Sequence, residues 1–303
     1  MTLQRLSAKV NELAADQVGA EPYSPLGLAN LAVFRQAEPT TFEGLIYEPV
    51  VCLVLQGEKH ATIADRSITY GAGETVIVSH EVPVVARITQ ASPQKPYLAL
   101  ILRLDLAVIR ELADQLGNFE TGGQQPRAIA VSKADDDLVE ALYRYVSLAG
   151  KAVEREVMAP LILKEIHFRL LVAPNGGMLR RLLHRDSQAS RIARAIDHIR
   201  RHFKTPLTVA ELAQVAGMSA SSFHEHFKAI AETSPLQYQK DLRLLEAKRL
   251  LAAGSHSVST AAFDVGYESA TQFSREYTRK FGTSPRHDLG RGDPDRRILA
   301  AIN

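Results

Sequence analysis

The sequence of 303 residues predicts an α+β fold, with a β-rich N-terminal part followed by an all-helical C-terminal part. Short β-branched runs separated by turn residues fill residues 31–103, which is typical of a barrel or a sandwich. Helical periodicity then takes over, and one helix–glycine–helix pattern occurs twice in the last third. The length allows roughly two domains, which we place at residues 1–177 and 178–303.

The strands are expected where apolar, β-branched runs are short. Val50–Gln56 reads VVCLVLQ, as in a strand buried in the core. Ala64-Asp65-Arg66 and Gly71-Ala72-Gly73 are turn candidates. Further strands are expected at Lys59–Ile63, Ser67–Tyr70, Thr75–Ser79, Val84–Ile88 and Tyr97–Leu102.

Three helices are expected between the barrel and the C-terminal part, at Leu104–Leu116, Asp136–Leu148 and Glu154–Val172. Pro160 should limit or kink the third, because proline removes a backbone donor. These helices are expected to cover the barrel. The apolar residues of the third either pack within the subunit or form a dimer surface. Turn formers in a row make Pro174-Asn175-Gly176-Gly177 the linker candidate.

The repeat in the C-terminal part lies at Leu207–Lys228 (LTVAELAQVAGMSASSFHEHFK) and Val258–Phe281 (VSTAAFDVGYESATQFSREYTRKF). Each copy predicts a short alanine-rich helix, a turn opened by a glycine, and a second helix with aromatic anchors four residues apart. This is the pattern of a helix-turn-helix unit, whose second helix enters the major groove of DNA. The glycines are Gly217 and Gly266, and the aromatic pairs are Phe223/Phe227 and Phe273/Tyr277.

The spacer between the copies suits two adjacent grooves. Pro235–Ala253 predicts one helix, and ~18 helical residues span about 27 Å. Successive major-groove segments on one DNA face lie ~34 Å apart. Ser190 is a candidate cap for the helix before the repeat, and Thr208 with Glu211 form a capping-box signature.

The charge is unevenly divided, which favours a nucleic-acid partner for the C-terminal part. Residues 178–303 hold 20 Lys/Arg against 13 Asp/Glu, whereas residues 1–177 hold 16 against 21. A solvated basic surface is the alternative to DNA binding.

No apolar run approaches the ~18 residues of a membrane span, and the N-terminus lacks a signal peptide's apolar core. With Cys52 as the one cysteine, we expect a cytoplasmic protein that has no membrane partner.

The C-terminal sequence resembles the DNA-binding domain of the AraC/XylS transcription regulators over about 100 residues, including AAFDVGYESATQFSREYTRKFGTSPRH. The resemblance implies two helix-turn-helix units joined by a long helix. It also implies base-reading roles for Ser221, His224 and Glu225 in the first unit and for Thr271, Gln272 and Arg275 in the second. Phosphate contacts are expected from Ser219, Ser222, Lys228, Ser274 and Arg279.

The N-terminal sequence YEPVVCLVLQGEKHATIADRSITYGAGETVIVSHEVPV resembles the cupin-like barrel of one branch of this family. A barrel mouth is a common small-molecule site, so we expect an effector pocket involving Cys52, Lys59, His60 or Arg87. Cys52 is either a buried small hydrophobe or a thiol that reacts with an electrophilic effector such as an aldehyde. No His-x-His occurs in this barrel region, where His60 and His80 stand alone, so no metal or other cofactor is expected.

These observations favour a transcription regulator, more in keeping with an activator, whose N-terminal domain senses a small molecule. Its expected partners are double-stranded promoter DNA, the effector, RNA polymerase and a second copy of the chain as a homodimer. The first alternative is a cupin-type enzyme with a regulatory helical tail, which lacks the expected metal ligands, so we predict no enzyme activity. The second is a ligand-insensitive DNA-binding protein with an inert dimerisation barrel.

Overall fold

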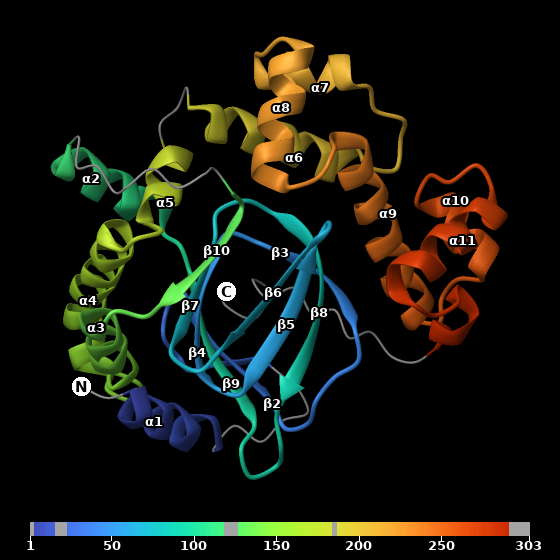
Figure 1. The fold of residues 1–303 in the computed structure, drawn as a ribbon. Helices are drawn as coiled ribbons and strands as arrows, with labels where there is room; N and C mark the ends of the chain where they lie inside the picture. The colour runs from blue at the N-terminus through green and yellow to red at the C-terminus, as the bar shows by residue number, and fades with distance from the viewer. Residues whose placement is uncertain (1–2, 16–22, 118–126, 184–186, 291–303) are drawn as a thin grey trace.

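The computed structural model describes residues 3–15, 23–117, 127–183 and 187–290 (Figure 1). Two antiparallel sheets enclose a core, with helices over one sheet and a helical part beside the other. This arrangement confirms the α+β prediction. The first sheet has the order β1-β2-β9-β4-β7-β10 and the second has the order β3-β8-β5-β6. The strands are β1 (Tyr23–Pro25), β2 (Leu31–Gln36), β3 (Glu43–Tyr47), β4 (Val50–Gln56), β5 (Glu58–Ile63), β6 (Arg66–Gly71), β7 (Glu74–Val78), β8 (Val82–Gln90), β9 (Tyr97–Arg103) and β10 (Ile129–Lys133).

The helices fall into two groups along the chain. The first group covers the outer face of the six-stranded sheet: α1 (Leu3–Ala15), α2 (Leu106–Leu116), α3 (Asp136–Val146), α4 (Ala152–Val172) and α5 (Gly176–Leu183). The second group forms the C-terminal part: α6 (Gln188–His202), α7 (Val209–Ala216), α8 (Ala220–Ala231), α9 (Pro235–Ala252), α10 (Val258–Asp264), α11 (Ala270–Phe281) and the 3₁₀ turn η1 (Pro285–Asp288).

The six-stranded sheet is apolar on both faces, which explains the unbroken apolar run of β4. Successive strand residues point to opposite faces. Val50, Cys52 and Val54 therefore face the barrel interior, while Val51 and Leu53 face the covering helices, and Leu55 lies with them. Strand β9 divides in the same way. A strand covered on both sides has no polar face to show, so its sequence does not alternate.

Four details differ from the sequence predictions. Strand β10 was not predicted; its sequence IAVSK is short, and it pairs with β7 far back in the chain. Helix α4 runs through Pro160, so proline does not end it. Gly176 and Gly177 begin α5 rather than a linker, and a side chain at Gly176 would overlap the carbonyl of Leu171 at the end of α4. Ser187, not Ser190, caps α6 by accepting a hydrogen bond from the Ser190 amide.

Each α-helix of the C-terminal part begins after a Ser or Thr whose side chain accepts a hydrogen bond from the backbone N–H three residues on. Such caps stabilise a helix by roughly 0.5–2 kcal/mol each. Thr208 accepts from the Glu211 amide as predicted. The caps are Ser187, Thr208, Ser219, Ser234, Ser257 and Ser269.

Gly266 has a stricter role than Gly217, although both have the positive φ expected from the repeat. We predict that Gly266→Ala lowers the free energy of unfolding by about 2–4 kcal/mol, because a Cβ there would overlap the carbonyl oxygen of Lys204 in addition to the backbone strain. Gly217→Ala, which meets no atom within 4 Å, is the matched control and should cost only about 1–2 kcal/mol. Urea unfolding measures both, and equal losses would contradict the contact.

Candidate nucleic-acid interface and barrel cavity

The two copies of the repeat fold into the same local structure. After α7 the amide of Met218 donates to the carbonyl of Ala213 (2.9 Å), and after α10 the amide of Tyr267 donates to that of Ala262 (3.0 Å). Each hydrogen bond closes the turn that follows a positive-φ glycine. Two helix-turn-helix units are therefore present, α7–α8 and α10–α11 (Figure 1).

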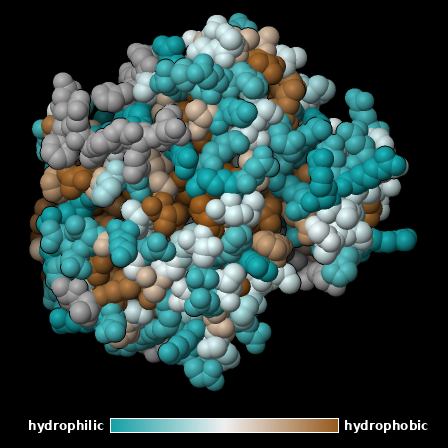
Figure 2. All heavy atoms as spheres, in the orientation of Figure 1, coloured by the Kyte–Doolittle hydropathy of each residue, from teal (hydrophilic) through white to brown (hydrophobic). Residues whose placement is uncertain are grey.

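The aromatic pairs anchor the second helix of each unit. The rings of Phe223 and Phe227 are fully buried with centroids 5.5 Å apart, and Phe273 and Tyr277 repeat this spacing in α11. Because these residues take the inward face of each helix, the residues between them must face away from the core. Figure 2 shows that hydrophilic side chains dominate the lobe that holds α10 and α11.

The six predicted base-reading side chains are all solvent-exposed, three on α8 and three on α11. Arg275, which makes no side-chain hydrogen bond or ion pair to other described residues, extends from α11 as a free cation. Gln272 donates to Glu276 (3.1 Å), which also accepts from Tyr267 and Lys240. The structure gives no contact with DNA, so the base-reading roles stay predictions for Ser221, His224, Glu225, Thr271, Gln272 and Arg275.

The predicted phosphate contacts divide into two kinds. Lys228 and Arg279 are exposed cations. Two of the three serine hydroxyls are engaged within their own helices: Ser219 caps α8 by accepting from the Ser222 amide, and the Ser274 hydroxyl donates to the Ala270 carbonyl (2.9 Å). Phosphate binding by these hydroxyls would have to share or replace such bonds. Their roles stay predictions.

Helix α9 and one arginine fix the two units relative to each other. The guanidinium of Arg243 donates to the carbonyls of Phe203 (2.6 Å) and Thr205 (3.0 Å), which follow α6, and of Gly266 (2.8 Å) in the second unit. Gln239 donates to the same two carbonyls after α6. The 18 residues of α9 span about 27 Å. These contacts and α9 therefore fix how α8 and α11, the second (recognition) helices of the two units, lie relative to each other.

The barrel interior contains a small cavity of about 30 Å³. Cys52 and Lys59, two of the residues predicted for the effector pocket, line it, and their effector role stays a prediction. His60 and Arg87 do not: they are partners across strands β5 and β8 on the outer face, and both lie beside the ring of Phe42. These two predicted pocket residues lie outside this cavity because the alternation of β5 turns Lys59 inward and its neighbour His60 outward. The lining consists of Tyr23, Phe34, Tyr47, Val50, Cys52, Lys59, Tyr70, Val76, Val78, Tyr97, Ala99 and Ile101.

Burial governs the chemistry of these cavity groups. It raises the pKa of the Cys52 thiol to about 11, and Lys59 only partly offsets this. Burial alone lowers the pKa of Lys59, but the groups that face it, above all the Tyr47 phenol, outweigh burial and raise that pKa. At neutral pH the cavity thus holds a neutral thiol and a charged ammonium.

His80 has a structural position at the join between the barrel and α6. It is 4% exposed; its Nδ1 lies 2.9 Å from the Ser79 hydroxyl and its Nε2 lies 3.0 Å from the Ala189 carbonyl. Burial lowers the pKa of His80, and the hydrogen bond to Ala189 only partly opposes this. Within the part of the chain that the structure describes, no group of three or more His, Cys, Asp and Glu side chains is placed to hold a metal ion.

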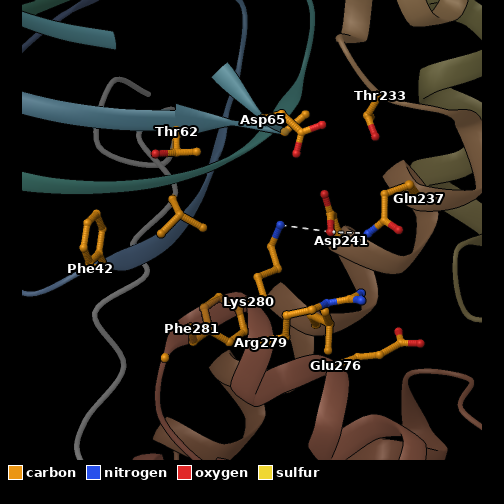
Figure 3. Close-up of a pocket in the computed structure, with 14 residues that line it drawn as sticks. Phe42, Thr62, Asp65, Thr233, Gln237, Asp241, Glu276, Arg279, Lys280 and Phe281 are labelled. Carbon is orange, nitrogen blue, oxygen red and sulfur yellow. Dashed lines mark hydrogen bonds and ion pairs between the residues drawn. The ribbon is translucent and has the colours of Figure 1, made fainter. Parts of the chain in front are cut away.

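A larger cleft of about 790 Å³ separates the four-stranded sheet from α9 and α11 (Figure 3). Thr62 and Asp65 border it from the barrel, and Asp241 and Lys280 border it from the helices, where they form an ion pair (2.9 Å). Arg279, a predicted phosphate contact, also lines this cleft. This cleft could not be predicted from the sequence, since its two walls lie more than a hundred residues apart in the chain.

Away from this cleft the barrel holds the first helix-turn-helix unit directly. Arg66 of β6 pairs with Glu232 at the end of α8 through two hydrogen bonds (2.5 and 2.6 Å). The amide of Ala128, just before β10, donates to the carbonyl of Ile230 in α8 (2.9 Å). The Tyr238 hydroxyl of α9 donates to the carbonyl of Glu81 (2.8 Å). The barrel therefore contacts the C-terminal end of one recognition helix.

The comparisons with known proteins agree with both parts of the fold. Residues 27–178 match the profile of the AraC-type transcriptional regulator N-terminus, and residues 212–291 match that of a helix-turn-helix domain. The chain belongs to the AraC family of transcriptional regulators. No helix among the described residues of this family member is long and apolar enough to cross a membrane.

Individual relatives of this AraC-family chain are distant. The regulator CdhR of Pseudomonas aeruginosa is 29% identical over 46% of this chain and 39% of its own length. The activator RhaS of Salmonella agona is 25% identical over 59% of this chain and 63% of its own length. The chain thus matches less than two thirds of either relative. Among solved structures, ToxT of Vibrio cholerae has a TM-score of 0.53 at 10% identity, covering 85% of this chain and 95% of ToxT, which shows a shared fold.

We predict that Cys52 is unreactive in the folded protein. With a pKa of about 11, roughly 0.1% of the thiol is ionised at pH 8, and the thiolate is the nucleophile. Iodoacetamide at pH 8, followed by mass spectrometry, should leave the folded chain unmodified and alkylate the same chain in urea. Rapid alkylation of the folded chain at pH 7 would restore the reactive-thiol hypothesis.

Proposed function

We propose that this chain is a sequence-specific DNA-binding transcription regulator, an activator, whose N-terminal barrel senses a small molecule. The observation that carries the proposal is the pair of helix-turn-helix units with exposed polar faces, held apart by α9. Two units so spaced can insert recognition helices into successive major grooves. RhaS, to which the chain is similar, is a transcriptional activator, and this supports activation as the direction of control.

The two units contribute unequally in this proposal. The α11 face presents Gln272, Arg275 and Arg279, and Gln and Arg are side chains that recognise adenine and guanine edges. On the α8 face the negative charge of Glu225 offsets the positive charge of Lys228. A carboxylate there is repelled by the negative potential of DNA. Base preference therefore comes mainly from α11, whereas α8 helps to position the protein on the DNA and adds affinity for the phosphate backbone.

Strand β6 is the proposed route from the cavity to the DNA-binding part. Tyr70 lines the cavity, and Arg66, four residues earlier on this strand, pairs with Glu232 at the end of α8. Four strand residues span about 13 Å. A ligand that binds one arrangement of these contacts better than another shifts the population of DNA-competent chains.

The homodimer and the contact with RNA polymerase also belong to this proposal. The first half of α4 exposes Val153, Val157 and Leu161, whose exposed fractions are 82%, 65% and 59%. They lie four residues apart, on one face of the helix. Such an apolar stripe favours pairing between two chains, which would then cover two adjacent or looped sites on the promoter. RNA polymerase is the partner that any activator must reach.

The DNA-binding proposal predicts a specific effect of Arg275→Ala. Loss of a bidentate base contact should cost about 1–3 kcal/mol on the footprinted site and relax the preference at one base position. Footprinting on the DNA that flanks the gene defines the site, and a base-substitution series measures the preference. Arg110→Ala, an exposed arginine on α2, is the control. Equal weakening on specific and random DNA would show that Arg275 contacts phosphate only, and an absent footprint would contradict the proposal itself.

The coupling route predicts that Arg66→Glu changes DNA affinity although Arg66 lies in the barrel. The double variant Arg66→Glu/Glu232→Arg should restore it, with a coupling energy of roughly 0.5–2 kcal/mol for a pair that is partly exposed. Arg144→Glu, which breaks a similar pair with Glu165 between α3 and α4, is the matched control. Unchanged DNA affinity in Arg66→Glu, with the fold intact by circular dichroism, would exclude this route.

A further inference from the structure

Lys59 is the unusual residue of the barrel interior. Strand β5 alternates, so that Lys59, Ala61 and Ile63 face inward while the residues between them face outward. Its inward neighbours are the small or apolar side chains expected of a core. The long cationic side chain of Lys59 ends instead among the rings of the cavity wall, 5.6 Å from the Phe34 ring centre and 5.3 Å from that of Tyr47.

The ammonium has no carboxylate to neutralise it. No acidic side chain of the described residues lies within ion-pair distance of Lys59, and Glu43 acts on it only from farther away. Aromatic faces attract a cation by about 0.5–2 kcal/mol, and the Tyr47 phenol rather than a carboxylate is the main group that opposes the effect of burial on the pKa of Lys59. Buried charges in proteins are normally paired, and the usual exceptions are functional.

The remaining polar groups of the cavity suit an anion too. The hydroxyls of Tyr47 and Tyr70 are hydrogen-bonded to each other (2.9 Å), and one of the two protons remains available to an acceptor. Burial raises the pKa of Tyr70 further above its already high value, so that this phenol stays protonated and able to donate. The cavity thus offers donors beside Lys59 and apolar walls elsewhere, such as Val76 and Ile101.

We propose that the barrel cavity binds a small organic acid, with its carboxylate on the Lys59 ammonium and the Tyr47 and Tyr70 hydroxyls, and its apolar body against the aromatic wall. The organic acid is the chemical class of the effector in the proposed function. Acid binding itself does not depend on that function, and only its regulatory meaning rests on it. Binding is ionic and reversible: a charged ammonium does not attack a carbonyl, so no imine forms.

The size of the cavity limits how the acid is held. A volume of about 30 Å³ accommodates a group about as large as a carboxylate, whereas ligand sites generally measure 300 Å³ or more. A longer body must displace rings. Among these rings, Tyr23 lies on β1, an edge strand of the six-stranded sheet, with its ring centre 4.8 Å from that of Phe34 on the paired strand β2. Ligand entry therefore changes the packing of this edge.

The test compares acids with their neutral isosteres on the full-length chain. Phenylacetate and hexanoate should raise the melting temperature and bind in calorimetry, whereas phenylacetamide and hexanamide should bind at least tenfold more weakly. Lys59→Met should weaken acid binding at least tenfold, and Lys133→Met, on the exposed side of β10, should not. Lys59→Gln serves as a second variant should Lys59→Met fail to fold.

Three outcomes would overturn the assignment: amides that bind as tightly as the acids, acid binding that survives loss of Lys59, or no binding of either acid at millimolar concentration. A borohydride-reducible adduct of an aldehyde on Lys59, formed in preference to acid binding, would also overturn it. DNA footprinting of the same preparation separates the two proposals. A chain that footprints but binds no acid contradicts only the ligand class.

Discussion

The fork of hydrogen bonds from Arg243 is the interaction on which the relative placement of the two helix-turn-helix units depends. One planar guanidinium joins two carbonyls that follow α6 to a third at Gly266, at the opening of the second turn. A guanidinium presents its donors in a fixed geometry, so three acceptors on two units cannot move independently. Burial lowers the pKa of Arg243, yet an arginine remains charged, and the three bonds keep that charge satisfied. The spacing of α8 and α11 follows from this joint together with α9.

The barrel imposes a second constraint on the C-terminal part, because it packs against α9, the helix that carries Arg243. Helix α9 contacts β3 and β8, and Gly44 of β3 has no room for a side chain: a Cβ there would overlap Leu245 and Phe281. Ile46 and Val85 of the barrel extend the core of the second unit. The interior residues of the barrel and those of the first unit form one connected apolar cluster. Changes inside the barrel therefore reach both units through packed atoms rather than through a flexible tether.

How much of the fold and of the candidate site could be predicted from the sequence depends on how close in the chain the interacting residues lie. The helix-turn-helix units were predicted because glycines, caps and aromatic spacing act within about twenty residues, and Gly217 has the left-handed conformation expected. Strand β10 and the Arg66–Glu232 pair were not, since each joins segments far apart in the chain. The sequence also does not show which side chains of β5 face the barrel interior, because Glu58, Lys59 and His60 are all polar. Its pairing with β6 and β8 decides that Lys59 faces the core.

The two halves of the repeat differ in a way that joins recognition to control. The unit with the stronger set of predicted base-reading side chains, α10–α11, presents Arg275 on its exposed face, while Arg279 lies beside the cleft. The unit with the weaker predicted set, α7–α8, is the one whose second helix ends on the barrel, at Ile230 and Glu232. A ligand in the barrel can change DNA affinity only by favouring one arrangement of these contacts over another. In the proposed function the coupling therefore acts first on the placement of α8, and it reaches the predicted base-reading side chains of α11 only through α9.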